Sequence, residues 1–206
     1  MATSDIRPAA PCAHERILNA AYELFSQRGI RAVGTDEVIE RAGVAKATLY
    51  RHFATKNDLV LAVLDRREEI WTHGLIEAQS EQRGDTPEER LLAIFDVMHE
   101  WFQLRDGYEG CSFINVLLEL GADHPAGQAS IAHIDHVRDI VRRRALAAGL
   151  TDVEDFASSW HILMKGAIVL AAVGDLDAAR RAQKMAILLI EQHRSDTIVE
   201  MGEAAG

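Results

Sequence analysis

The feature that most constrains the fold is the stretch 35–59, TDEVIERAGVAKATLYRHFATKNDL, which reads as two short helices, a tight glycine turn between them, and the start of a third helix. Thr35 is suited to cap the first helix by accepting a backbone N–H bond. Gly43 is suited to the left-handed conformation that ends a helix at little cost. Leu49 and Phe53 are four residues apart, so one face of the second helix is apolar. We therefore expect the second helix to pack through that face and to expose the other.

The exposed side of this second helix carries polar and basic side chains, namely Lys46, Thr48, Tyr50, Arg51 and His52. Such an arrangement is typical of a helix-turn-helix, whose second helix lies in the DNA major groove. The charge of the whole chain would not suggest this, because 206 residues carry a net charge of −10. Residues 1–56 hold eight Lys or Arg and six Asp or Glu (net +2), whereas residues 57–206 hold fourteen and twenty-six (net −12). Any contact with DNA is therefore confined to one small face.

The segment RAGVAKATLYRHFATKNDL (residues 41–59), with the preceding ERILNAAYELFSQRGI (residues 15–30), resembles the TetR (tetracycline-repressor) family of bacterial transcriptional regulators. The resemblance covers roughly residues 13–64. Ala45 stands where the family commonly has Ser, which removes a side-chain cap that contributes about 1 kcal/mol. Ala47 stands where Gly is common. These departures leave the base preference open.

The resemblance implies which side chains meet DNA. Those expected at backbone phosphates are Thr35, Lys46, Thr48, Tyr50, His52 and Lys56. Those expected at base edges are Lys46, Ala47, Thr48, Tyr50 and Arg51, with Ala47 able to touch a thymine methyl group. Taken singly, each could instead be a solvated surface side chain. The expected partner is double-stranded DNA with a palindromic operator, because one recognition helix reads too few base pairs and a homodimer doubles the number.

The remainder of the chain predicts helices only. The strongest start signal is Thr86-Pro87-Glu88-Glu89, which combines a Thr cap, Pro at the first position and Glu at the third. We expect an all-α protein of about nine helices: a three-helix DNA-binding domain followed by a helical domain for ligand and dimer contacts. The expected ranges are a disordered arm at 1–12, the helix-turn-helix domain at 13–58, the effector and dimerisation domain at 59–194, and a flexible tail at 195–206.

Two apolar stripes near the end of the chain suit pairing of two subunits into a four-helix core. The residues predicted at this dimer interface are Phe156, Trp160, Leu163, Ala167, Ala182, Met185, Ala186 and Leu189. The alternative is that both stripes pack inside one monomer.

A small-molecule effector is implied by the resemblance, and a ligand that prefers the conformer unable to bind DNA would lower DNA affinity by linkage. The apolar residues predicted to line its site are Trp101, Phe102, Phe113, Trp160 and Met164. The predicted polar contacts are Asn115, Glu119 and His161. For each residue taken singly, an ordinary core or surface position is the favoured alternative. The regulator could also be an activator, or act without an effector.

Other functions have little support. The chain has no GxSxG, phosphate-binding loop, HExxH or dinucleotide fingerprint, so we predict that it is not an enzyme, with a helical enzyme as a remote alternative. His124, His133 and His136 lie close in sequence, and the last two share a helix face. This pattern suits either a metal site or a polar exposed face, and we assign neither a metal nor a cofactor.

The compartment follows from the cysteines and the apolar runs. Cys12 and Cys111 show no metal-type spacing, which is typical of a reducing cytoplasm. The N-terminus lacks a signal pattern, and the longest apolar run is too short to cross a bilayer. We expect a cytoplasmic protein with no membrane partner.

Overall fold

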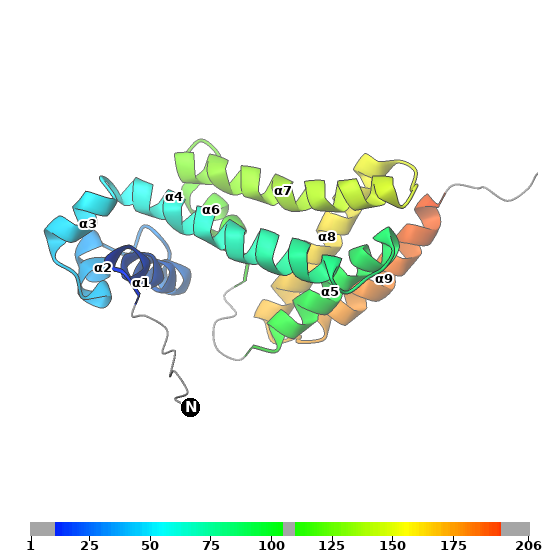
Figure 1. Cartoon of the computed structure of the whole chain (residues 1–206), viewed down its shortest axis with the longest axis horizontal. Helices are drawn as coiled ribbons and strands as arrows, with labels where there is room; N and C mark the ends of the chain where they lie inside the picture. Colours follow the sequence, from blue (N-terminus) through cyan, green and yellow to red (C-terminus); the bar gives the residue numbers. More distant parts are fainter. Residues whose placement is uncertain (1–10, 105–109, 195–206) are drawn as a thin grey trace, which may run out of the picture. The chain divides into compact units, whose positions relative to one another are not determined.

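The computed structural model describes residues 11–104 and 110–194, and within these ranges every regular element is a helix (Figure 1), apart from one isolated antiparallel bridge between Leu150 and Arg194. The elements are α1 (Ala13–Arg28), α2 (Thr35–Ala42), α3 (Lys46–His52), α4 (Lys56–Arg67), η1 (Glu68–Gln79), α5 (Pro87–Phe102), α6 (Ser112–Leu120), α7 (Pro125–Ala147), α8 (Val153–Ala172) and α9 (Ala178–His193). The expected all-α fold of nine α-helices is confirmed for the described residues. The predicted tail, and most of the predicted arm, lie outside them.

The chain forms two compact units. Unit 1 contains residues 1–66 and 114–130, and unit 2 contains residues 67–113 and 131–206. The chain passes from one unit to the other inside three helices: at the α4–η1 junction, in α6 and in α7. The first boundary between the compact units therefore lies at 66/67, beyond the predicted domain boundary at 58/59. The segment 114–130 belongs to the same unit as the N-terminal helices. The functional domains remain a prediction.

Unit 1 is organised around the apolar face of α1. Ile17, Leu18, Ala21 and Phe25 are buried, as their three-to-four spacing predicts. Helices α2 and α3 both pack on α1. The core of unit 1 is therefore shared among three short elements, none of which has a complete core of its own.

Helices α4 and η1 follow one another without a break and form one continuous helix. Its second half, η1, is a π-helix of 12 residues. A π-helix hydrogen-bonds each N–H to the carbonyl five residues earlier and is therefore wider than an α-helix. A Cβ atom at Gly74 would approach the carbonyl oxygen of Glu69, five residues earlier, to 3.3 Å. The sequence predicts a continuous helix here but not its π character, because the apolar residues keep the three-to-four spacing of an ordinary helix.

The start of α5 is capped as its sequence predicts. The amide of Glu89 donates to Thr86 Oγ1 at 3.2 Å, and the amide of Thr86 donates to Glu89 Oε2 at 2.9 Å. These backbone bonds hold the pKa of the Glu89 carboxyl below its usual value.

The core of unit 2 joins α5, α8 and α9. Helix α9 packs on both α8 and α5. The ring of Trp160 lies 5.1 Å from that of Phe95 and 5.3 Å from that of Phe156, measured between centroids. All three side chains are fully buried. None of the described helices is long and apolar enough to cross a membrane.

A buried arginine ties α7 to the end of η1. Only 7% of Arg144 is exposed. Its guanidinium donates to Ser80 Oγ at 2.7 Å, to the carbonyl oxygen of Glu77 at 3.0 Å, to that of Arg90 at 3.1 Å and to Glu81 Oε2 at 3.2 Å. Burial lowers the pKa of this guanidinium. Arg144 therefore adds a donor to the Glu77 carbonyl at the end of η1, which also accepts the backbone N–H and the hydroxyl of Ser80.

We expect Arg144→Met to lower the free energy of unfolding by about 3 kcal/mol, because it removes the four hydrogen bonds that this buried guanidinium donates. Urea unfolding at fixed protein concentration measures the effect. The neighbouring Arg143 serves as the control: its side chain is 57% exposed and pairs only with Glu77 in the described structure. Arg143→Met should change stability by less than about 1 kcal/mol. Equal effects of the two substitutions would contradict this role for Arg144.

Candidate nucleic-acid interface

The turn between α2 and α3 depends on Gly43. Its backbone is left-handed, with φ 61° and ψ 43°. The amide of Gly43 donates to the carbonyl oxygen of Glu40 at 3.1 Å, and that of Val44 donates to Ile39 at 3.3 Å. A Cβ atom at Gly43 would meet nothing within 4 Å, so glycine is needed here for its backbone conformation and not for space. The turn is the one that the sequence predicts.

Helix α3 is fixed by one buried side chain and its neighbour. Leu49 is completely buried, and Phe53, directly after the helix, is 5% exposed. Ala45 at the N-cap provides no side-chain hydrogen bond. The other side of the helix is exposed at Lys46, Ala47, Tyr50, Arg51 and His52, with Thr48 half-buried.

Contacts within unit 1 orient several of these exposed side chains. The hydroxyl groups of Tyr50 and Thr35 share a hydrogen bond of 3.3 Å, which links α3 to the start of α2. Lys46 Nζ lies 3.1 Å from Asp36 Oδ1, and this carboxylate raises the pKa of Lys46. The ring of His52 lies 5.5 Å from that of His14 at the start of α1.

Lys56 is predicted to contact a DNA phosphate, and in the structure its ammonium group contacts unit 1 itself. Its Nζ donates to the carbonyl oxygen of Ile30 at 2.5 Å and lies 5.9 Å from the centre of the Phe25 ring. The side chain is half-buried. Lys56 therefore holds the α1–α2 turn against the start of α4, and a phosphate contact from it stays a prediction.

The carboxylate of Glu119 in α6 fixes the same turn from another direction. It accepts the backbone N–H groups of Ile30 at 2.9 Å and Arg31 at 2.6 Å. Gly29 precedes them with φ +79°, and a Cβ atom there would lie 3.0 Å from Glu119 Oε2. The sequence predicts Glu119 as an effector contact, whereas the structure places it in unit 1 as a partner of the DNA-binding helices.

The other predicted effector residues lie in several places, and an effector contact from them stays a prediction. Trp101, Phe102, Phe113, Trp160 and Met164 are buried in unit 2, in separate ring contacts: Trp101 with Trp71, Phe113 with His133, and Trp160 with Phe95 and Phe156. Asn115 is exposed and belongs to unit 1. Burial, followed by the charges of Lys165 and Arg138, lowers the pKa of His161 to about 3.

Basic side chains lie over two of the tryptophans in unit 2. Lys165 Nζ is 5.5 Å from the centre of the Trp71 ring, and Arg67 Cζ is 5.6 Å from that of Trp101. The two indoles lie 5.6 Å apart. We refer to Arg67, Trp71, Trp101, His161 and Lys165 as the aromatic–basic cluster. The sequence analysis missed three of its members, and the signal available was the four-residue spacing of His161 and Lys165 on one helix.

The structure places most of the predicted dimer residues inside one chain. Buried residues among them are Phe156, Trp160, Ala167, Ala182 and Ala186, and only Met185, 58% exposed, is largely open. Leu163 and Leu189 are half-buried. The stripes recognised in the sequence are thus the faces by which α8 and α9 pack on their neighbours, and this is the alternative left open by their spacing.

A short helix that exposes polar side chains after a left-handed glycine turn, and that is fixed by a buried leucine, defines a helix-turn-helix protein of the DNA-binding type. The family model described as "Bacterial regulatory proteins, tetR family" matches residues 17–63. The N-terminal helices therefore match the DNA-binding domain of the TetR family, as the resemblance predicts.

Relatives and solved structures agree with this assignment. The HTH-type transcriptional activator FasR of Mycolicibacterium smegmatis is 46% identical over 63 residues, which are 31% of this chain and 29% of FasR. The transcriptional regulator AcuR of Cereibacter sphaeroides is 30% identical over 116 residues, which are 56% of this chain and 52% of AcuR. The matched part is thus about half of these relatives or less. A crystal structure of a TetR-family transcriptional regulator from Streptomyces coelicolor superposes with a TM-score of 0.79 and 26% identity, covering 89% of this chain and 96% of that one.

Proposed function

We propose that the protein is a dimeric transcriptional repressor that binds a palindromic operator and is released from it by a small-molecule effector. The observation that carries the proposal is the exposed face of α3, on which Lys46, Tyr50 and Arg51 surround a helix fixed by the buried Leu49. Such a face provides donors for phosphates and base edges on one short surface.

The charge distribution of the chain limits how many DNA phosphates the exposed face of α3 and its surroundings can contact. Residues 57–206 carry a net charge of −12, so most of the chain is repelled by DNA phosphates. Binding then depends on a small number of phosphate contacts. The dependence of affinity on salt should therefore be shallow for a protein of this size, since its slope counts the phosphates that are neutralised.

A dimer is supported by apolar side chains that α8 and α9 leave exposed. These are Ile162 and Val169 on α8 and Val173 at its C-cap, exposed by 71%, 58% and 77%, and Met185 and Leu188 on α9, exposed by 58% and 64%. The spacing of three, four or seven residues places each set on one face of its helix. Gly166 belongs to the α8 set and permits close approach of a second helix. A second copy of this chain is the occupant that two-fold operator recognition requires.

The effector proposal is supported by the aromatic–basic cluster. Trp71 Nε1 and both ring nitrogens of His161 are buried without a hydrogen-bond partner among the described residues. Such atoms call for an additional partner. The charged groups that act on His161 are the cations Lys165 and Arg138. An anionic effector with an aromatic body suits these neighbours, because it supplies both acceptors and a negative charge.

An activator is the second candidate, because FasR is named a transcriptional activator. The identity to FasR is restricted to 63 residues, so it supports DNA binding and not the direction of regulation. The position of the operator relative to the promoter separates the two candidates: overlap with the promoter supports repression, and a site upstream of it supports activation.

We expect Tyr50→Ala and Arg51→Ala each to weaken operator binding at least about tenfold, because each removes contacts within a groove. Fluorescence anisotropy on the DNA footprinted upstream of the gene measures the affinity. Arg51→Ala should also reduce the salt slope by about one if Arg51 meets a phosphate. Arg143→Ala, an exposed arginine of unit 2, is the control. Unchanged affinity of both variants for the operator at about 150 mM salt would contradict the assignment of α3 as the helix that contacts DNA.

We expect Val169→Asp and Leu188→Asp each to give a monomer in sedimentation velocity at micromolar concentration, where the unmodified chain is a dimer. The two-fold axis places two new carboxylates in one apolar interface, which is strongly unfavourable. Leu146→Asp provides the control, since Leu146 is an equally exposed leucine of α7. A monomeric unmodified chain, or dimers that survive both substitutions, would exclude this interface.

We expect the aromatic anion anilinonaphthalenesulfonate to bind more tightly than uncharged anilinonaphthalene, and Lys165→Met to remove at least about tenfold of this preference. The quenching of tryptophan fluorescence follows binding. Lys184→Met is the matched control, because Lys184 is exposed on α9. Equal binding of the charged and uncharged compounds would rule out an anionic effector at this cluster.

A further inference from the structure

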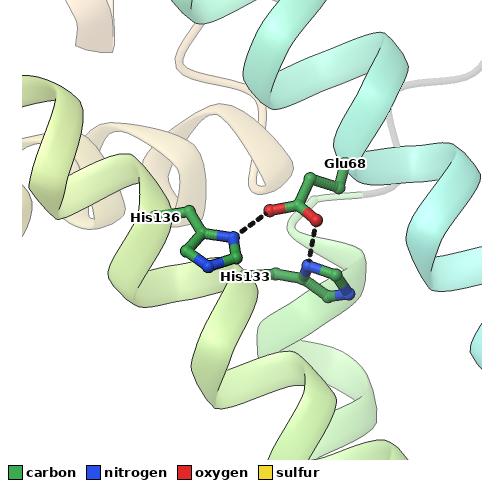
Figure 2. A group of neighbouring side chains, drawn as sticks. All are labelled: Glu68, His133 and His136. Carbon is green, nitrogen blue, oxygen red and sulfur yellow. Dashed lines mark hydrogen bonds and ion pairs between the residues drawn. The ribbon is translucent and has the colours of Figure 1, made fainter.

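Two histidines of α7 converge on one glutamate of η1 (Figure 2). Glu68 Oε2 lies 2.5 Å from His133 Nδ1, and Glu68 Oε1 lies 2.5 Å from His136 Nδ1. One potential ligand atom from each residue lies within 4.8 Å of the other two. All three residues belong to unit 2.

The cluster is buried on one side and open on the other. The side chains of His133 and Glu68 are 7% and 13% exposed, whereas that of His136 is 52% exposed. The ring of Phe113 lies 5.0 Å from that of His133, centroid to centroid, and restricts its orientation. His133 and Glu68 are therefore held by their surroundings, whereas His136 is accessible to solvent and to an ion from solvent.

Two imidazoles and one carboxylate are the ligand set of a zinc-type site that keeps a position for water. Calcium and magnesium prefer oxygen ligands only, so the two nitrogens disfavour them. Zinc bonds of about 2.1 Å in a tetrahedron separate neighbouring ligand atoms by about 3.4 Å. The three residues each place one ligand atom within 4.8 Å of the other two, which is close enough for one ion to contact all three (Figure 2).

We propose that Glu68, His133 and His136 bind one divalent transition-metal ion of the zinc type, with the remaining position open to water beside His136. The sequence groups His124 with the two histidines, but the structure does not. His124 Nδ1 accepts the backbone N–H of Ala126 at 3.1 Å, in unit 1. The third potential ligand beside His133 and His136 is therefore Glu68 and not His124.

The position of this site suggests what the ion does, and this part rests on the proposed function. Glu68 is two residues beyond the end of the first segment of unit 1, Phe113 directly precedes the second segment, and His133 comes three residues after it. The site therefore joins, within unit 2, residues that are close in sequence to the three positions at which the chain changes unit. An ion bound there favours one setting of these helices and so changes operator affinity by linkage.

Isothermal titration of the metal-free full-length protein with zinc chloride tests the site. To exclude binding by the exposed Cys12, the experiment uses a Cys12→Ser background. We expect one ion per chain, and His136→Gln and Glu68→Gln should each weaken binding at least about tenfold. His73→Gln is the matched control, because His73 pairs with Glu77 at 2.9 Å in the same segment η1 and is not part of the cluster. The visible spectrum of bound cobalt(II) reports whether nitrogen ligands are present.

Absence of stoichiometric binding, or binding that both substitutions leave unchanged, would overturn the site. His136 is exposed, so His136→Gln should retain the circular dichroism of the unmodified chain. Operator anisotropy with zinc and with a chelator then tests the regulatory part. Ion binding without a change in operator affinity keeps the site and rejects its regulatory role. Failure to bind the operator in either state rejects the proposed function, and the ion stoichiometry still decides the site.

Discussion

The burial of Leu49 and Phe53 is the interaction on which the exposed face of α3 depends. Helix α3 has seven residues and no side-chain cap, and a helix of this length is not stable alone in water. It persists because these two side chains are almost completely buried in unit 1. The same burial determines which side of α3 faces outward. The exposure of Tyr50 and Arg51 is thus a consequence of the core of unit 1, and not a separate property of the helix.

Contacts outside α3 hold its surroundings in place. The turn after α1 is held by the Lys56 ammonium on the carbonyl oxygen of Ile30 and by the Glu119 carboxylate on two backbone amides. Glu119 belongs to α6, which enters unit 1 from a later part of the chain. The geometry of the DNA-binding helices therefore depends on a segment that the helix-turn-helix sequence does not contain. A change in α6 can reach the α1–α2 turn through one carboxylate.

The sequence predicts local features well because their cause and effect lie within a few residues. Gly43 at a left-handed turn, Thr86 as a cap and Ala45 as a missing cap belong to this group. The partners of Glu119 and of His133 could not be predicted, because they lie far away in the chain and ordinary helical spacing carries no information about them. For α8 the spacing indicates an apolar face but not what covers it. Helix α8 has two apolar faces. The face with Phe156 and Trp160 is buried inside the monomer, and the face with Ile162 and Val169 is exposed.

The ion-free arrangement at Glu68 limits how a metal can act. The carboxylate already joins both imidazoles at 2.5 Å, so an ion does not order a loose segment there. It replaces contacts of 2.5 Å by ligand separations of about 3.4 Å, a change of about 1 Å at the side chains that η1 and α7 contribute. Packed helices respond to such displacements by changing between discrete arrangements. A tenfold change in operator affinity requires only about 1.4 kcal/mol of difference in ion binding between two arrangements.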